Sequence, residues 1–568
     1  MTQGRLRFVA SLALTLVILL AACAPSTPSR GSATNPASQA QPAEAPQKAL
    51  VVAMSIEPAL LEPSLLPQNR EYSGLSSGFL TYFTPNQQAM PYLASEIPSV
   101  ENGSWKVLPD GRMLTTYLIR PNATWQDGQP LTAHDFAFAF QVRMDPAFPA
   151  QSFSVERLLT SVVAVDDRTL LLDWKEPYLY AASVHLPDFS PMHRQRLEPL
   201  YQEDKTAFVD GPHWREQFIG SGPYRLERWD PGLEMVFQAN QGFVLGAPKV
   251  EQIRIRFIPD ANAIVANLLS NAVDMAFSIN ISFPQGQALE QGGFDGKVEY
   301  WDGNPRILEF QARDWGNLQR GVSDVRVRRA ALHAIDRQAI VDGIYAGKAR
   351  VAYFWLTPTD PAFPAVDRAV TKYEFNPARS AALLSEAGWT KGGDGVARNA
   401  AGDPLFFSLM NQPTEVDQQE AAVVLSDWKN AGIGGEIHRL STQEMRDNEL
   451  RAKYPGVAYN RRALTLENMV WTSRQIARAD NRWSGQNRNG YVNPALDEAW
   501  LKVLGSTDDR EREGPLVEGI RIMQDDAMVT LTHLQPDIMA YRTGLQNVQQ
   551  ASVVGVSSFW NVWEWRWS

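Results

Sequence analysis

The sequence predicts an α/β fold, because segments typical of strands and segments typical of helices alternate along its folded part. Its 568 residues are 44% hydrophobic and 20% charged, which is typical of a soluble globular protein with several domain-sized units. The net charge of −10 and pI of about 5.4 lack the basic footprint of a nucleic-acid-binding protein. A mean hydropathy of −0.28, with one long apolar stretch, excludes a polytopic membrane protein.

The first residues predict a secretion signal. Arg5 and Arg7 precede the apolar run 8–22, which is short for a membrane span and typical of a signal-peptide core. The run ends at Cys23 in the sequence Leu-Ala-Ala-Cys, which resembles a bacterial lipobox. This implies that residues 1–22 are cleaved and that a lipid on Cys23 anchors the protein outside the cytoplasmic membrane, in the periplasm or at the cell surface. The alternative is a secretory signal with an incidental cysteine.

Residues 23–47 predict a disordered tether. Pro, Ser, Ala, Gln and Thr dominate this stretch, and none of its residues is large and apolar. As a flexible coil it would span about 27 Å between the membrane and the folded body. The folded chain is expected from residue 48, with a first strand at 49–53. Cys23 is the only cysteine, which excludes an internal disulfide and a Cys-based metal site.

Capping residues predict several helices. Thr132 to Asp135 has capping-box form, and Pro at the first helical position follows a cap residue at Asn376 and Asn493. Gly388, Gly505 and Gly432 are the expected stops of helices, the last one ending a helix over 415–431. Asp336 caps a further helix directly after the one that passes through Ala331.

Alternating apolar residues predict strands. A hairpin is expected from 163–165 and 170–174 around the turn 166–168, and a half-buried strand at 253–257. The closely spaced Trp560, Trp563, Trp565 and Trp567 predict a buried closing strand rather than a ligand platform.

A set of short motifs follows in a fixed order along about residues 50–540. The longest runs from Asn122 to Asp135 and contains the tight-turn pair Asp127-Gly128. The others are Gly220-Ser-Gly222-Pro223-Tyr224, Ile258-Pro-Asp260-Ala261, Ala272-Val-Asp274, Val325 to Ala330, Ala334-Ile-Asp336-Arg337, Tyr373 to Pro377, Leu383 to Trp389, and Gly490 to Pro494 with Asp497. The ordered set resembles the family 5 extracellular solute-binding proteins, the peptide/nickel-type binding components of ABC importers.

The resemblance implies a two-lobed, periplasmic-binding-protein-like clamp that closes on its ligand by hinge motion. Lobe I is discontinuous in this family and is expected at 48–80, 216–305 and, as a C-terminal return, 541–568. An added subdomain of lobe I is expected at 81–215, and lobe II at 306–540.

Catalytic and metal-binding motifs are absent from the sequence. It contains no His-Glu-x-x-His, no phosphate-binding loop and no Gly-x-Ser-x-Gly, and its seven histidines lack helical metal-ligand spacing. The sequence therefore predicts no enzyme, no resident metal and no cofactor, while a nickel chelate or haem held by one histidine stays open.

The ligand-determining stretch is expected at 459–468. In the peptide binders of the family, a tryptophan and, three residues later, an aspartate that holds the ligand's ammonium precede an acidic segment. A gapless match at Glu467-Asn468 places Tyr459 at the tryptophan and Arg462 at the aspartate. An arginine prefers carboxylate or phosphate, so Arg462, with Arg461 as its alternative, is predicted to contact an anionic group. If a gap shifts the register, Arg462 is a surface residue and Glu467 takes the anchor role.

Further candidates for the cleft are Glu57, Tyr72, Trp355 and Trp471, each of which could equally belong to the core. The sequence predicts a monomeric substrate-binding lipoprotein that captures a peptide-like or other medium-sized, possibly anionic solute and delivers it to ABC permease subunits. The alternatives are a lipid-anchored hydrolase and a ligand sensor that use the same cleft.

Overall fold

The computed structural model describes residues 48–62, 70–85, 88–147, 155–176, 178–184, 189–462, 471–550 and 557–568. Residues 47–568 form one compact unit. The predicted signal peptide, Cys23, the tether and Glu467 lie outside the described residues. Within these ranges, no helix is long and apolar enough to cross a membrane.

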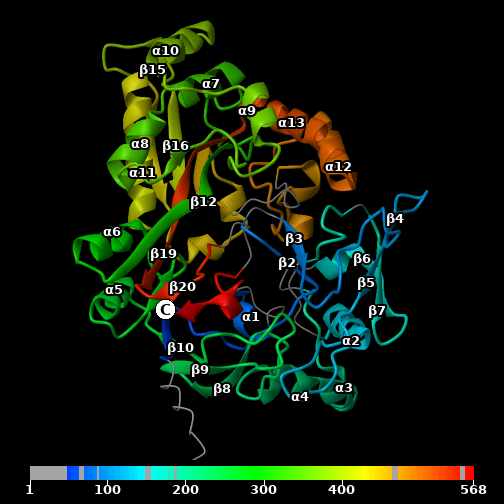
Figure 1. Ribbon diagram of the computed structural model, residues 1–568. Coiled ribbons are helices and arrows are strands. Elements are labelled where there is room, and N and C mark those ends of the chain that lie inside the picture. The colour runs from blue at the N-terminus through cyan, green and yellow to red at the C-terminus, as the bar shows by residue number, and fades with distance from the viewer. Residues whose placement is uncertain are drawn as a thin grey trace, which may run out of the picture. The chain divides into compact units, whose positions relative to one another are not determined.

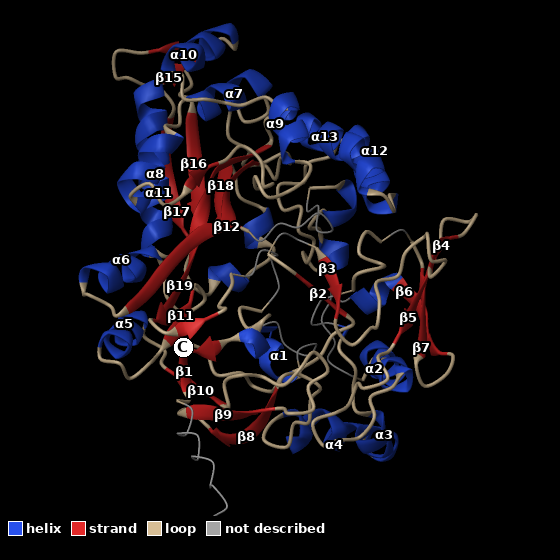
Figure 2. Cartoon of the chain, viewed as in Figure 1, coloured by secondary structure: helices blue, strands red, loops and turns tan. Residues whose placement is uncertain are grey.

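The main sheet joins eleven strands of the described chain (Figure 2). Ten lie in the order β17-β16-β18-β12-β19-β11-β1-β10-β9-β8, and β13 pairs with β19. Their bounds are β1 Leu50–Met54, β8 Tyr224–Asp230, β9 Glu234–Ala239, β10 Gln252–Phe257, β11 Met275–Phe277, β12 Gly296–Phe310, β13 Arg350–Val351, β16 Phe406–Asn411, β17 Gly434–Arg439, β18 Val457–Arg461 and β19 Val529–Arg542. We use lobe I for β1 and β8–β11 and lobe II for β16–β18, with the helices packed on each.

Strands β12 and β19 join the two lobes. They pair antiparallel from Gly296↔Arg542 to Glu309↔Val529, and they run side by side through the middle of the molecule (Figure 1). The register shifts between Asp302 and Pro305, where a proline cannot donate to the ladder. The sheet therefore continues from one lobe into the other through a single irregular strand pair.

A second sheet lies in the region predicted as an added subdomain. It has the order β4-β5-β7-β6 and packs with α2 around its own apolar core. Its strands are β4 Trp105–Val107, β5 Met113–Leu118, β6 Leu159–Ala164 and β7 Thr169–Trp174, and three two-stranded pairs add β2 Thr81–Phe83 with β3 Ala89–Pro91, β14 Thr390–Lys391 with β15 Ala397–Arg398, and β20 Leu545–Gln546 with β21 Arg566–Trp567. The predicted hairpin is confirmed by β6 and β7. The predicted lobe boundaries stay predictions.

The helices begin and end where the capping residues indicate. Thr132 and Asp135 form the capping box of α2, and Asn376 and Asn493 cap α10 and α12. Helix α11 covers the predicted 415–431, and Gly432 follows it in the left-handed conformation that glycine favours. The bounds are α1 Arg70–Ser76, α2 Ala133–Met144, α3 Arg194–Glu203, α4 Lys205–Asp210, α5 Ala261–Leu269, α6 Phe283–Gln291, α7 Val325–His333, α8 Arg337–Tyr345, α9 Phe363–Ala369, α10 Pro377–Glu386, α11 Glu415–Ala431, α12 Pro494–Gly505 and α13 Asp509–Asp526.

The prediction of a C-terminal closing strand is wrong in its secondary structure. Trp560, Trp563 and Trp565 are buried, as predicted, but they lie in turns around a 3₁₀ segment, Val562–Glu564. Only Arg566–Trp567 pairs as a strand. The indoles of Trp560 and Trp563 stack on Tyr82 and Tyr92, so ring packing rather than a strand ladder determines this segment's conformation.

A buried ion network lies where β12 and β19 meet lobe II. Arg306 of β12 is fully buried, with Nη1 2.8 Å from Asp417 Oδ1 and Nε 2.5 Å from Glu420 Oε2. Glu420 also accepts a hydrogen bond from Tyr345 Oη and lies 2.9 Å from His533 Nε2 of β19. The network connects both crossing strands to α8 and α11.

We predict that Arg306→Ala lowers the free energy of unfolding by about 3–5 kcal/mol, because it leaves two carboxylates buried without their counter-charge. Urea denaturation of the purified protein measures this loss. The matched control is Arg350→Ala, which removes an ion pair to Asp302 that is half exposed and contributes about 0–1 kcal/mol. Equal losses in the two variants would contradict the role given to Arg306.

Candidate ligand-binding site

A cavity of about 560 Å³ lies where the two lobes meet the crossing strands. Lobe I contributes the loop after β11 and the start of α6, from Ser278 to Gln285. Lobe II contributes the loop from β16 into α11, residues 412–417, together with Arg461 at the end of β18. Strand β19 contributes Gln535, Pro536 and Asp537. The volume suits a medium-sized solute.

The ion network forms one wall of this cavity. Asp417 and Tyr345 belong to the cavity lining, and behind them lie Arg306 and Glu420. Burial opposes the charge of Glu420, but Arg306 and His533 lower its pKa to about 2. Gln535 Nε2 donates to Tyr345 Oη at 2.8 Å. These contacts hold the polar groups of this wall in fixed positions before a ligand arrives.

Three charged side chains of the lining, Glu415, Arg461 and Asp537, stand apart from this network. Glu415 and Arg461 are exposed, and Asp537 is half-buried on β19, which β12 separates from β18 in the sheet. Burial raises the pKa of Asp537, against the opposing influence of Arg461 and of a hydrogen bond with Ser278. Gly303 makes room for this carboxylate, because a Cβ at residue 303 would lie 2.5 Å from Asp537 Cγ. The cavity therefore offers both a cation and a carboxylate to a ligand.

Of the predicted site residues, Arg461 lines this cavity and Tyr459 does not. Tyr459 is fully buried, its hydroxyl lies 2.8 Å from Thr532 Oγ1, and the guanidinium of Arg306 stacks on its ring at 4.4 Å. Because successive residues of β18 face opposite sides of the sheet, Asn460 and Arg462 lie on the other face. Because Tyr459 is fully buried and its hydroxyl is bonded to Thr532, it is a packing residue behind the cavity wall.

Arg462 and Trp471 both contact Glu309 of β12. Arg462 Nη2 lies 3.3 Å from Glu309 Oε2, and Trp471 Nε1 donates to Glu309 Oε1 at 2.8 Å. All three side chains are buried. The structure thus pairs Arg462 with a carboxylate of the protein itself. The contact of Arg462 with the solute stays a prediction.

The remaining candidates lie apart from the cavity lining. Trp355 packs against Trp471 and Trp500 in the core of lobe II. In lobe I, Tyr72 is buried and donates to the carbonyl of Ile56, and Glu57 accepts from Trp229 Nε1 at 2.6 Å. Glu467 lies outside the described residues. Of the predicted site residues that the structure describes, only Arg461 lines the cavity.

Gln535 and Asp537 were not predicted from the sequence as site residues. The available signal was a proline and an aspartate inside an otherwise apolar strand pattern, at 536 and 537, where a central strand rarely carries them. Such interruptions mark places where a strand borders a site rather than a core.

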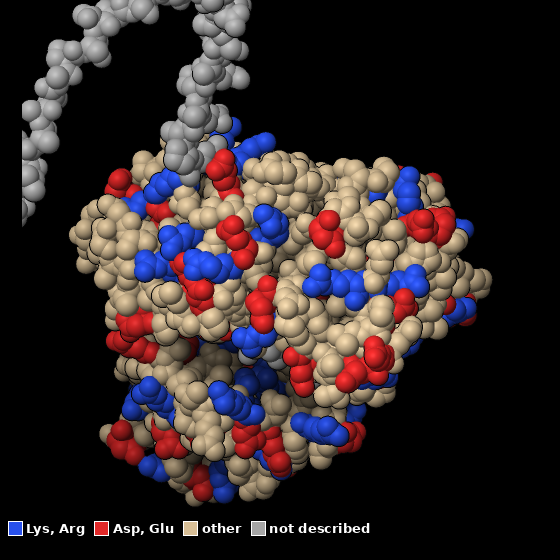
Figure 3. All heavy atoms as spheres, turned by 90° about the horizontal axis from the view of Figure 1, so that it is seen from below, with Lys and Arg blue, Asp and Glu red and all other residues tan. Residues whose placement is uncertain are grey.

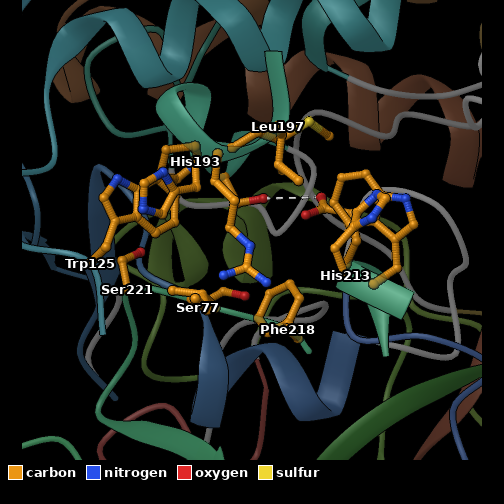
Figure 4. Close-up of a pocket in the computed structure, with 15 residues that line it drawn as sticks. Ser77, Trp125, His193, Leu197, His213, Phe218 and Ser221 are labelled. Atoms are coloured by element: carbon orange, nitrogen blue, oxygen red, sulfur yellow. Dashed lines mark hydrogen bonds between the residues drawn. The ribbon is translucent and has the colours of Figure 1, made fainter. Parts of the chain in front are cut away.

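A smaller cavity of about 20 Å³ lies elsewhere, lined by Ser77, Trp125, His193 and His213 (Figure 4). It has room for about one water molecule. Ser77 Oγ, His193 Nδ1 and His213 Nε2 are buried without hydrogen-bond partners, and burial lowers the pKa of His213. This cavity is too small for a solute, and no cluster of three or more metal-ligating residues occurs in the described part of the chain.

The surface drawn in Figure 3 carries charged side chains of both signs. On the face seen in Figure 3, Lys and Arg alternate with Asp and Glu without a large area of one sign.

Two lobes joined by crossing strands, with a cavity between them, define a two-lobed binding protein. The family model "Bacterial extracellular solute-binding proteins, family 5 Middle" matches residues 98–478. The chain therefore belongs to the family 5 bacterial extracellular solute-binding proteins, as its motifs predict. These are solute-binding proteins and not enzymes, so the hydrolase alternative falls away.

The chain is also similar to individual proteins. It is 28% identical over 429 residues to the oligopeptide-binding protein AppA of Bacillus subtilis, covering 74% of each chain. Its fold is similar to that of the oligopeptide binding protein from Thermus thermophilus complexed with a pentapeptide, with a TM-score of 0.70, 23% identity and coverage of 91% and 96%. For NikA from Brucella suis in complex with Fe(III)-EDTA, the TM-score is 0.75 at 19% identity, with coverage of 92% and 100%. The two structural likenesses confirm the predicted two-lobed α/β fold.

We predict that Tyr459→Phe lowers the free energy of unfolding by about 1 kcal/mol, since the Thr532 hydroxyl loses one of its buried partners. Affinity for the solute that co-purifies with the protein should stay within twofold, because the tyrosine lies behind the cavity wall. Urea denaturation and calorimetric titration measure the two quantities. A tenfold loss of affinity would show that Tyr459 contacts the solute.

Proposed function

We propose that the chain is the substrate-binding component of an ABC importer, which captures a peptide-like or other medium-sized solute by lobe closure and delivers it to a permease. The observation that carries this proposal is the 560 Å³ cavity bordered by both lobes and by the strands that join them. A rotation of one lobe about the irregular part of β12 and β19 changes the distance between its walls. The family and the named oligopeptide-binding relative support the choice of solute class.

The charges of the lining suit a ligand that carries both signs. Arg461 is exposed at the cavity and offers its planar donors to a carboxylate or phosphate, whereas Asp537 accepts from an ammonium or amide. Ligands with both kinds of group include peptides and amino-acid chelates. We therefore place the anionic group of the solute in this cavity at Arg461, the alternative to Arg462.

The lipid anchor on Cys23 is part of the same proposal. A thiol-linked lipid and the tether 23–47 would keep the binding protein near its permease in the membrane, raising the effective concentration at which the two meet. The lipobox-like sequence and the position of the single cysteine support it.

We predict that Arg461→Ala weakens binding of the co-purified solute about ten- to a hundredfold, because a charged hydrogen bond of about 1.5–3 kcal/mol is lost. Mass spectrometry identifies the solute, and calorimetry on the stripped protein measures its affinity. Arg320→Ala is the control, since this exposed arginine pairs with Asp403 away from the cavity lining. Affinity within twofold of wild type, or the absence of any solute and of transport in cells, would count against the proposal.

We predict that Cys23→Ala moves the protein from the membrane fraction to the soluble extracytoplasmic fraction, because the thiol is the attachment point of the lipid. Fractionation followed by immunoblotting tests this, with Ser26→Ala in the tether as the matched control. Retention of Cys23→Ala on the membrane would refute the lipoprotein assignment.

A further inference from the structure

Three arginines of lobe II lie together around one carboxylate. Arg451 belongs to the 3₁₀ turn Leu450–Ala452, Arg462 follows β18, and Arg488 lies in the loop before α12. Arg462 lowers the pKa of Arg451 and of Arg488, and Arg451 also lowers that of Arg488. Glu309 of β12 raises the pKa of Arg451 and of Arg488, and it pairs with Arg462. We call Arg451, Arg462 and Arg488 the arginine cluster.

Glu309 cannot compensate the whole cluster. This carboxylate is fully buried, and it already accepts from Trp471 Nε1 at 2.8 Å and Asn460 Nδ2 at 3.2 Å, besides its pairing with Arg462. Among the described residues, neither Arg451 nor Arg488 forms an ion pair. Within the part of the chain that the structure describes, three positive charges thus share one negative charge.

The donors of the cluster are also incompletely used. Arg462 Nη1 donates to the carbonyl of Gln486 at 2.7 Å, and Arg451 Nη1 donates to the carbonyl of Met445 at 3.1 Å. The Nε atoms of Arg462 and Arg488 are buried without a hydrogen-bond partner, and the residue Arg462 is only 8% exposed. A guanidinium stays protonated in proteins, so these groups cannot escape the cost by losing a proton.

The pKa shifts of Arg451 and Arg488 also indicate that the positive charge of the cluster is not fully compensated. Burial lowers the pKa of Arg488 and of Arg451, and the neighbouring Arg462 lowers both further. Burying an uncompensated charge costs several kcal/mol, and an anion in contact with the cluster would remove that cost. Guanidinium forks match the oxygens of carboxylates and phosphates better than they match a spherical ion.

We propose that Arg451, Arg462 and Arg488 form an oxyanion site of lobe II that takes a carboxylate or phosphate group. This site is distinct from Arg461, which faces the cavity from the other side of β18. It lies near that cavity, because Met445, whose carbonyl binds Arg451, belongs to the cavity lining. An oxyanion supplied by the captured solute rests on the proposed function, whereas a free inorganic ion does not.

The test measures thermal stability with added oxyanion. The full mature protein is studied as purified and after unfolding and refolding to remove bound solute, in sodium phosphate or sodium succinate against sodium chloride of equal ionic strength. The melting temperature of the stripped protein should rise by several degrees in the oxyanion salts. Arg320→Gln is the control and should show the same rise, which corrects for general salting effects.

Arg488→Gln and Arg451→Gln should lose at least half of that rise. Without added oxyanion, either variant should melt no lower than wild type, since the substitution removes a repelled charge. If both variants keep the full rise, or if the stripped wild type shows none, the proposal is overturned. If the melting temperature rises in the stripped protein but not in the protein as purified, the solute is the source of the oxyanion. If it rises equally in both preparations, a free ion is the source.

The outcome is separable from that of the import proposal. A protein that neither carries a solute nor supports transport would still show the phosphate-dependent rise if the oxyanion site exists. Conversely, a solute held at Arg461, with no effect of Arg488→Gln or Arg451→Gln, leaves the import proposal intact and removes the oxyanion site.

Discussion

The antiparallel pairing of β12 with β19 is the constraint on which the rest of this structure depends. Each strand begins in one lobe and ends in the other, so the sheet continues between the lobes through this pair. The register of the pair shifts twice, between Asp302 and Pro305 and between Arg306 and Ile307. Just beyond the first shift, Arg306 connects β12 to two carboxylates of α11, and His533 connects β19 to one of them. The position of α11, and with it one wall of the cavity, is therefore fixed relative to the crossing strands.

Lobe II contains two buried arginine sites of opposite electrostatic character. Arg306 lies between Asp417 and Glu420, so its single positive charge meets two negative charges, with His533 nearby. Around Glu309, the proportions are reversed, with three arginines to one carboxylate among the residues that the structure describes. Both sites lie on the same strand, β12, only three residues apart along the chain. A compensated buried network acts as a fixed support, whereas an uncompensated one is expected to respond to an added ion.

The sequence predicted the features of this fold that depend on neighbours in the chain. Asn376 and Asn493 cap helices because their side-chain oxygens accept from amides two or three residues later, and the backbone N–H of Thr132 donates to the Asp135 carboxylate three residues later. Such information is local. The two-lobed fold came from the ordered motifs. The site was harder to predict, because Arg306, Glu420 and His533 are more than a hundred residues apart and meet only through the sheet order. A gapless match also could not tell which face of β18 each residue occupies, and that face separates Arg462 from the cavity that Arg461 lines. The tryptophans after 560 pack ring on ring, which overrides the strand pattern of their spacing.

Strand β18 gives the two neighbouring arginines different roles through its period of two. Tyr459 and Arg461 lie on the face of the crossing-strand network, where Tyr459 packs on Arg306 and Arg461 reaches the cavity. Asn460 and Arg462 lie on the opposite face, where both contact Glu309. A shift of β18 by one residue would exchange these environments and would place an exposed charge among buried groups. Its register is held on both sides, by pairing with β12 and with β16. Because β12 also carries Arg306 and Glu309, the strand that joins the lobes sets the position of both arginines at once.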